Sequence, residues 1–320
     1  MSNAPTKFAR PVVVISKCLH GARCRYDGEG YRDAFVRALR PYVRYLPVCP
    51  EMEIGLGVPR DKIILVQHKN GARLHQPSNG RDLTDEMNRF ASRYLDGLGR
   101  VDGFLLKLKS PSCGLGMVKL YRTEDPGSRF SRRGVGLFAR QVTGRFGYSA
   151  IVDEESLASH ERRELWLTRL FTLAAFHAAL ESKRVNSLAR FHEHHRLLLQ
   201  TFGRKGAGNL NRIAAQGMTD FESREEYRRT LYDQLSDKPR KPALLDPLID
   251  AFEYYKRFLK KTDTVRFYDR VDEYGRGSLP LADLRKTVQV WAVRYDKSHI
   301  RQDAVYRPYP GPLAEMGSGL

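Results

Sequence analysis

The sequence of 320 residues has few cysteines and no long apolar run, and both shortages exclude classes of protein. No apolar stretch approaches the roughly 18–20 residues needed to span a bilayer. The N-terminus also lacks a signal-peptide core. Without an export signal, the four cysteines are not expected to form a disulfide framework. We therefore expect a cytoplasmic protein with no membrane partner.

Composition and charge indicate a folded protein with an anionic partner. The hydrophobic fraction of 41% is typical of globular chains, and the length allows two domains. The net charge is +18, of which residues 1–150 carry +13, with 26 Lys and Arg against 13 Asp and Glu. Lys and Arg release counterions from phosphate backbones, so this excess favours a polyanion such as RNA. A generally basic surface is the alternative.

The hydrophobic pattern changes character near residue 155. Before it, β-branched runs alternate with amphipathic helical stretches, and Asn70-Gly71 is typical of a hairpin turn. This alternation predicts an α/β domain with a largely parallel sheet. Later residues show repeated helical periodicity and almost no strand signal, which predicts an all-α domain. We place the two domains at residues 1–155 and 156–320, with candidate strands at Val12–Ile15, Val43–Val48 and Val101–Leu106.

Two segments are predicted to lack regular structure. Residues 121–136, rich in Gly, Ser and Arg, are expected to form a mobile basic loop, followed by a helix near Leu137–Gly144. The tail from Tyr306 onward is expected to be extended or disordered. The loop offers phosphate contacts for RNA, although a solvated run of charge would have the same composition. Its candidate contact residues are Arg122, Arg129, Arg132 and Arg133.

Three cysteines follow β-type runs, each in a turn just beyond the end of the run. They are Cys18, Cys49 and Cys113. Ligands of parallel sheets bind beyond the carboxyl ends of strands, so these thiols are expected to converge. Clustered thiols in a protein without disulfides favour a metal, an iron–sulfur cluster or nucleophilic catalysis. Their spacing does not separate zinc from iron–sulfur. Cys24 lies in the same turn as Cys18 and is a fourth ligand, a catalytic thiol or a neighbour.

Polar side chains beside these cysteines are candidates for proton transfer. Glu51 follows Cys49 by two residues and is a candidate general acid or base. Ser110 and Ser112 flank Pro111 beside Cys113, and either hydroxyl can bind or activate a reacting group. Capping of helices and turns is the alternative role for all three side chains.

A histidine cluster, His192-Glu193-His194-His195, lies in the predicted helical domain. His192 and His195 are three residues apart on one helix face, a spacing compatible with a metal pair. The motif departs from the zincin pattern, which places the second histidine four residues after the first. We expect a structural role or a contact with RNA.

The cysteine motifs together resemble a known family. The relevant stretches are residues 16–28, Cys49-Pro-Glu51 with Pro59-Arg60, and 109–114 (Lys-Ser-Pro-Ser-Cys-Gly). They resemble the domain of unknown function 523, which includes the thiouracil desulfidases, over residues 10–152. Residues 165–311, including residues 191–199 and the Tyr-Arg-Pro-Tyr-Pro motif at 306–310, resemble the domain of unknown function 1722. The combined architecture is similar to the bacterial RNA thiouridine desulfidases.

This resemblance implies a cofactor, a reaction and a set of site residues. It implies a [4Fe-4S] cluster with one iron free of protein ligands, held by Cys18, Cys49 and Cys113. Glu51 and Ser110 match the catalytic pair, and Cys24 falls outside the ligand set, with a four-cysteine cage as the alternative. The implied enzyme removes sulfur hydrolytically from 4-thiouridine in thiolated transfer RNA (tRNA), and its helical domain binds the RNA. The alternatives are a desulfidase for free thiouracil or thionucleosides, and a nucleic-acid-binding protein with a structural metal site.

Overall fold

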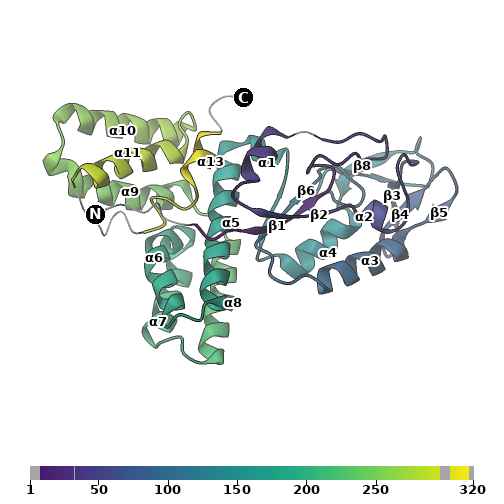
Figure 1. The fold of residues 1–320 in the computed structure, drawn as a ribbon. Coiled ribbons are helices and arrows are strands. Elements are labelled where there is room, and N and C mark those ends of the chain that lie inside the picture. The colour runs from purple at the N-terminus through teal and green to yellow at the C-terminus, as the bar shows by residue number, and fades with distance from the viewer. Residues whose placement is uncertain (1–7, 32, 296–302, 317–320) are drawn as a thin grey trace. The chain divides into compact units, whose positions relative to one another are not determined.

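The computed structural model describes residues 8–31, 33–295 and 303–316 (Figure 1). The chain divides into two compact units. One spans Arg10–Ser159, and the other begins at His160 and also includes Phe8 and Ala9. The first unit is α/β with a parallel sheet and the second is mostly helical, so the predicted fold class is confirmed. In the described part of the chain, none of the helices has the length and apolar character to cross a membrane.

A four-stranded parallel sheet, sheet A, forms the centre of the first unit. Its order is β2 (Arg44–Val48), β1 (Val12–Ser16), β6 (Gly103–Leu106) and β9 (Ala150–Asp153). Strands β1 and β6 are buried at every position, as expected for β-branched and apolar strands that are covered on both faces. Two short helices, α1 (Ala34–Leu39) and α2 (Pro50–Glu53), flank β2 in the sequence.

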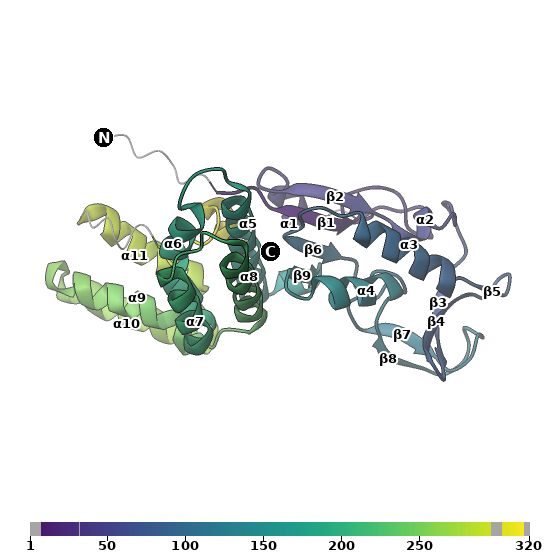
Figure 2. The ribbon, with the colours of Figure 1, turned by 90° about the horizontal axis from the view of Figure 1, so that it is seen from below.

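Two helices cover one face of sheet A. They are α3 (Thr84–Asp96) and α4 (Leu137–Phe146), which lie side by side in Figure 2. The core between helices and sheet contains the fully buried side chains of Val14, Phe104 and Phe138. The predicted helix near Leu137–Gly144 is therefore confirmed.

A second, mixed sheet, sheet B, extends the first unit. Its order is β5 (Arg81–Asp82), β4 (Gly71–Gln76), β3 (Ile64–His68), β7 (Val118–Tyr121) and β8 (Phe130–Gly134). Strands β3 and β4 form the hairpin predicted from Asn70-Gly71, with Gly71 at φ 115°.

The prediction of a mobile loop over residues 121–136 is wrong for its second half. Strand β8 pairs antiparallel with β7 there and carries Arg132 and Arg133. The rings of Phe130 and Tyr121 pack 5.3 Å apart across the two strands. A cross-strand aromatic pair stabilises a strand even where arginines dominate the composition.

The second unit packs its helices around one aromatic core. Buried side chains at its centre include Phe176, Leu198, Tyr227 and Phe252. This unit also includes the 3₁₀ turn Lys256–Phe258, while Ser156–Ala158 forms another at the end of the first unit. Its α-helices are α5 (His160–Glu181), α6 (Ser187–Phe202), α7 (Arg204–Ala215), α8 (Phe221–Ser236), α9 (Lys241–Tyr255), α10 (Lys261–Arg276), α11 (Leu281–Arg294) and α13 (Gly311–Glu315).

The prediction of an extended or disordered tail is wrong for residues 306–316. Val305, Tyr306 and Leu313 are buried, and Tyr306 Oη donates to the carbonyl of Pro247 at 3.1 Å. The preceding Asp303 accepts hydrogen bonds from the backbone N–H groups of Leu197 (2.9 Å) and Val305 (2.8 Å). Aromatic burial and these hydrogen bonds hold a segment whose prolines favoured an extended chain. Residues 317–320 lie outside the described residues.

Candidate functional site

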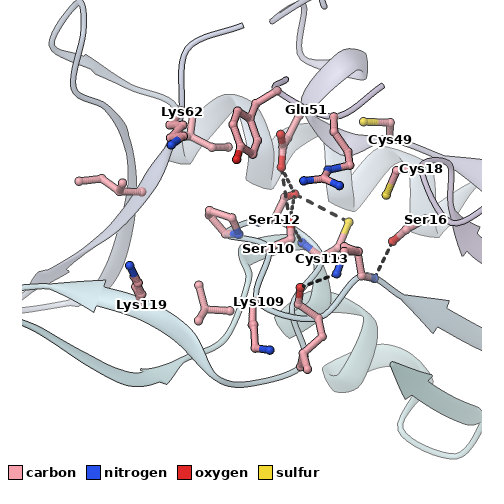
Figure 3. Close-up of a pocket in the computed structure, with 18 of the residues that line it drawn as sticks. Ser16, Cys18, Cys49, Glu51, Lys62, Lys109, Ser110, Ser112, Cys113 and Lys119 are labelled. Atoms are coloured by element: carbon pink, nitrogen blue, oxygen red, sulfur yellow. Dashed lines mark hydrogen bonds between the residues drawn. The ribbon is translucent and has the colours of Figure 1, made fainter. Parts of the chain in front are cut away.

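The three predicted thiols lie beyond the ends of three adjacent strands of sheet A. Cys49 directly follows β2, Cys18 follows β1 by two residues, and Cys113 follows β6 by seven. Hydrogen bonds fix these turns to one another: Lys17 N donates to the Val48 carbonyl at 2.8 Å, and Lys107 N donates to Ser16 Oγ at 2.9 Å. All three thiols line one cavity of about 470 Å³ (Figure 3). The topology thus brings together residues that are far apart in the sequence.

Cys24 lines the same cavity and is buried. Cys49 Sγ lies 3.8 Å from the Cys24 carbonyl oxygen, and hydrogen bonding with Cys18 raises the pKa of the Cys24 thiol to about 11. The hydrogen bond to Cys24, together with burial, raises the pKa of Cys49. Burial raises the pKa of Cys113 to about 12. These thiols are therefore protonated at neutral pH unless a cation stabilises the thiolate form.

The four thiols at this cavity are a suitable donor set for an iron–sulfur cluster. Across the described ranges, no three His, Cys, Asp or Glu side chains are close enough together to hold one ion. A [4Fe-4S] cluster presents a separate iron atom to each thiolate, so its ligands need not meet at one point. Four buried or half-buried thiols around one cavity, none of them in a disulfide, match this requirement. The residues present fit such a group.

The Ser-Pro-Ser-Cys turn is fixed by its own hydrogen bonds. Gly114 N donates to the Ser110 carbonyl at 2.8 Å, which closes the turn. Ser110 Oγ accepts from the backbone N–H groups of Cys113 at 3.1 Å and Ser112 at 3.3 Å. Just before the turn, Lys109 adopts a left-handed backbone with φ 63°. Strained residues of this kind are concentrated at functional sites.

Glu51, on the first turn of α2, projects toward the serine turn. Its Oε1 accepts from Ser112 Oγ at 2.6 Å and lies 3.4 Å from Ser110 Oγ. Its Oε2 accepts from Arg60, whose Nε lies at 3.0 Å and whose terminal nitrogen forms a second contact. The Arg60 side chain is 4% exposed and also donates to the Cys24 carbonyl at 3.0 Å. A carboxylate held at both oxygens beside buried thiols has the geometry of a general base.

The cavity runs from a sulfur end to a cationic end. In Figure 3, Cys18 and Cys49 lie on one side, Lys62 and Lys119 on the other, with Glu51 between them. Both lysines are exposed, so this end faces solvent. Arg132 also lines the cavity. The other predicted RNA-contact residues are exposed but do not line it; they are Arg122, Arg129 and Arg133.

Two histidines of the cluster, His192 and His195, are buried and engaged within the helical unit, whereas His194 is half-buried. His192 Nδ1 lies 3.0 Å from Tyr227 Oη, and His195 Nδ1 lies 2.9 Å from the Phe191 carbonyl. Burial lowers the pKa of His192 and brings that of His195 to about 3. Within the described residues, these histidines belong to no group able to hold a metal. Their contacts are those of a structural role.

Two residues of this site, Ser112 and Arg60, have no definite role predicted from the sequence. Ser112 makes the shorter contact with Glu51, although Ser110 was the predicted partner. In the sequence, Arg60 is recognisable only as part of a Pro-Arg motif. Its burial beside Glu51 cannot be recognised from sequence alone, because an arginine before a strand is usually exposed.

Comparison with known proteins confirms the resemblance expected from the motifs. Residues 13–155 match the family described as 2-thiouracil desulfurase, and residues 196–310 match DUF1722, a family of unknown function. A Bacillus subtilis (strain 168) protein named "Uncharacterized protein YbbK" is 26% identical over 151 residues, covering 45% of this chain and 97% of that protein. The solved structure of the [4Fe-4S]-dependent thiouracil desulfidase TudS is 28% identical, covering 46% of this chain and 93% of that one, with a TM-score of 0.37. This chain is thus a two-domain protein that resembles the 2-thiouracil desulfurase family in its first part and DUF1722 in its second, and the first match supports a desulfidase.

Proposed function

We propose that this protein is a [4Fe-4S]-dependent desulfidase that converts 4-thiouridine in tRNA to uridine and releases hydrosulfide. One observation carries the proposal: the thiols of Cys18, Cys49 and Cys113 and the carboxylate of Glu51 face one cavity. The match to the 2-thiouracil desulfurase family supports the reaction class. The cationic end of the cavity and the net charge of +18 support an RNA substrate.

The proposed reaction is a hydrolysis and needs no oxidant or reductant. The bond between C4 and sulfur is replaced by a bond between C4 and the oxygen of one water molecule. Sulfur leaves as hydrosulfide, and one proton is released. A cluster held by Cys18, Cys49 and Cys113 would supply an iron without a protein ligand, which acts as a Lewis acid toward the thiocarbonyl sulfur.

The protein's own residues provide proton transfer and substrate binding. Glu51 accepts the proton of the attacking water, because it is the one carboxylate among the described residues that line this cavity and Arg60 holds its orientation. Ser110 hydrogen-bonds the reacting group as its proton moves. Lys62, Lys119 and Arg132 contact phosphates beside a base that has been turned out of the RNA stack.

The direct test uses anaerobically reconstituted protein and tRNA that contains 4-thiouridine. We expect the near-ultraviolet absorbance of 4-thiouridine to disappear, with equal amounts of uridine and hydrosulfide formed. An unchanged absorbance with a fully loaded cluster contradicts the proposal. Free thiouracil and thionucleosides are assayed in parallel, and faster turnover of these favours the small-molecule alternative.

The purified protein itself gives a second test. We expect brown protein whose iron and sulfide contents correspond to one four-iron cluster. Colourless protein with one zinc, together with full function of Glu51→Ala, would instead indicate a nucleic-acid-binding protein with a structural metal. Only the first result is compatible with the proposed reaction.

A further inference from the structure

Ser110 and Glu51, the predicted catalytic pair, are too far apart for a normal hydrogen bond between their side chains. Their side-chain oxygens are 3.4 Å apart, well beyond the usual length of an O–H···O hydrogen bond. Ser112 bridges the gap, because its Oγ lies 2.6 Å from Glu51 Oε1 and 2.9 Å from Ser110 Oγ. A bond of 2.6 Å to a carboxylate is in the range of charge-assisted hydrogen bonds.

The number of available protons fixes the direction of this chain. An ionised carboxylate only accepts, so Ser112 donates its single hydroxyl proton to Glu51. Ser110 must therefore be the donor at the contact between the two serines. Ser110 Oγ in turn accepts from the backbone N–H groups of Cys113 and Ser112. The hydroxyl protons thus point in order from Ser110 through Ser112 to Glu51.

Burial and hydrogen bonds hold the side chains of Ser112 and Glu51 in these positions. The residue is 1% exposed, and its carbonyl accepts from Ala139 N of α4 at 3.1 Å. Arg60 holds Glu51 Oε2 and is itself held by the carbonyls of Cys24 and Gly57, both at 3.0 Å. Oε1 is therefore the carboxylate oxygen left for the serines.

We infer that Ser112 is a positioning residue that orients Glu51 and carries protons between Ser110 and Glu51. The inference rests on the proposed desulfidase function. When the attacking water replaces the long 3.3 Å contact from Ser112 N at Ser110 Oγ and gives up a proton there, the proton of Ser110 passes to Ser112, and that of Ser112 passes to Glu51 Oε1. The two serines end neutral, Glu51 is protonated, and the water oxygen keeps the electron pair that it uses to attack carbon. No bond to carbon forms or breaks in the relay itself.

The kinetic test compares Ser112→Ala with Ser112→Thr and with Ser149→Ala. Ser149 is a matched control, since it is also 1% exposed, its hydroxyl donates to the Phe146 carbonyl at 2.7 Å, and it does not line the cavity. In single-turnover assays normalised to bound cluster, we expect Ser112→Ala to lower the rate by about 10²-fold, within the range for general acid–base catalysis, with little change in KM. The threonine variant should recover much of this loss, and Ser149→Ala should match the wild type.

Two further readouts separate proton transfer from a purely structural effect. The rate in mixtures of H₂O and D₂O should depend non-linearly on deuterium content in the wild type and linearly in Ser112→Ala, because a multi-proton relay is lost. The double variant Ser110→Ala/Ser112→Ala should be no slower than the slower single variant, since both act in one chain.

An infrared measurement tests the geometry without the cluster. The difference between cluster-free wild type and Glu51→Gln isolates the carboxylate band of Glu51. That band should shift in the Ser112→Ala background and stay in place with Ser149→Ala. An unmoved band, or a wild-type rate for Ser112→Ala with full cluster, overturns the inference alone. An inactive wild type with a loaded cluster instead overturns the proposed function.

Discussion

The two units of this protein differ in how they place their reactive side chains. In the α/β unit, thiols from turns far apart in the sequence line one cavity. In the helical unit, histidines that are neighbours in the sequence have separate structural contacts: His192 contacts Tyr227, and His195 stacks on Phe191 with ring centroids 4.2 Å apart.

The difference follows from the geometry of the elements that carry the residues. Parallel strands end at a common edge, so any residue placed just after such a strand joins the same site. Successive residues of a helix point in directions about 100° apart, so a sequence cluster is divided among different neighbours. Proximity in sequence is therefore a weaker indication of a site than a shared position after parallel strands.

The largest effect is expected from removing a thiol. Cys49→Ser should abolish the visible absorption of the reconstituted cluster and all desulfidase activity, because a hydroxyl is a poor ligand for iron in such clusters. The measurement is iron and sulfide content after anaerobic reconstitution. His192→Leu, which removes a side chain from the sequence cluster, serves as the control and should load normally.

Cys24→Ser tests whether every thiol that lines the cavity is a cluster ligand. We expect this variant to retain the cluster, because the resemblance places Cys24 outside the ligand set. Loss of iron equal to that of Cys49→Ser would instead support a four-cysteine cage.

The next largest effect is expected at Glu51. Glu51→Gln should slow desulfidation by about 10²–10⁴-fold, the range for loss of a general base, with the iron content unchanged. Glu53→Gln is the matched control, since Glu53 lies on the same short helix but does not line the cavity. Equal rates for the two variants would remove Glu51 from the mechanism.

In the helical unit, the histidine cluster is expected to affect stability rather than chemistry. Burial holds the pKa of His195 at about 3, below its ordinary value of 6.5, with His194 and His192 also disfavouring its charge. The unfolded chain therefore binds the proton first, and stability is lost as pH falls below about 6.5, by a few kcal/mol. Thermal unfolding at pH 7.5 and 5.0 should show a smaller acid loss for His195→Leu than for the wild type. An identical loss would contradict this account.

The smallest effect is expected at the cationic end of the cavity. Arg132 lines the cavity, whereas its neighbour Arg133 does not. Arg132→Gln should weaken turnover of both thiolated RNA and a thiolated mononucleotide by a few fold. Arg133→Gln should affect RNA alone, reducing the salt dependence of binding by about one unit for a lost phosphate contact. Unchanged turnover of the thiolated mononucleotide by Arg132→Gln would contradict a role for Arg132 in the cavity.

The sequence was sufficient to predict those features that depend on local pattern. A β-branched run predicts β1 and an apolar run predicts β6, and the rule for strand ends predicts that Cys18, Cys49 and Cys113 converge. The Asn70-Gly71 turn is equally predictable, because the positive φ of Gly71 depends only on the residue type at that position.

Other features depend on partners that are distant in the sequence. Helix α7 contains Gly206 and Gly208, which disfavour a helix, yet a Cβ at Gly206 would lie 1.7 Å from Oε1 of the buried Gln234, whose side chain would have to move. The burial of Tyr306 depends on Pro247 in α9. The preference of Glu51 for Ser112 over Ser110 is a difference of 0.8 Å between two contacts, which no spacing rule resolves.

The serine turn and helix α4 are joined by backbone hydrogen bonds and a close backbone approach. Leu137 N donates to the Pro111 carbonyl at 3.1 Å and Gly136 N to the Gly114 carbonyl at 2.8 Å, so the first turn of α4 is capped by the turn that carries Cys113. A Cβ at Gly136 would lie 2.4 Å from the Ser112 carbonyl oxygen, so there is no space for a side chain between the helix and the turn. Amide hydrogens of the turn and of the first turn of α4 should consequently exchange with solvent through one shared opening. Local unfolding of α4 would therefore disorder the turn that carries Cys113 while sheet A stays folded.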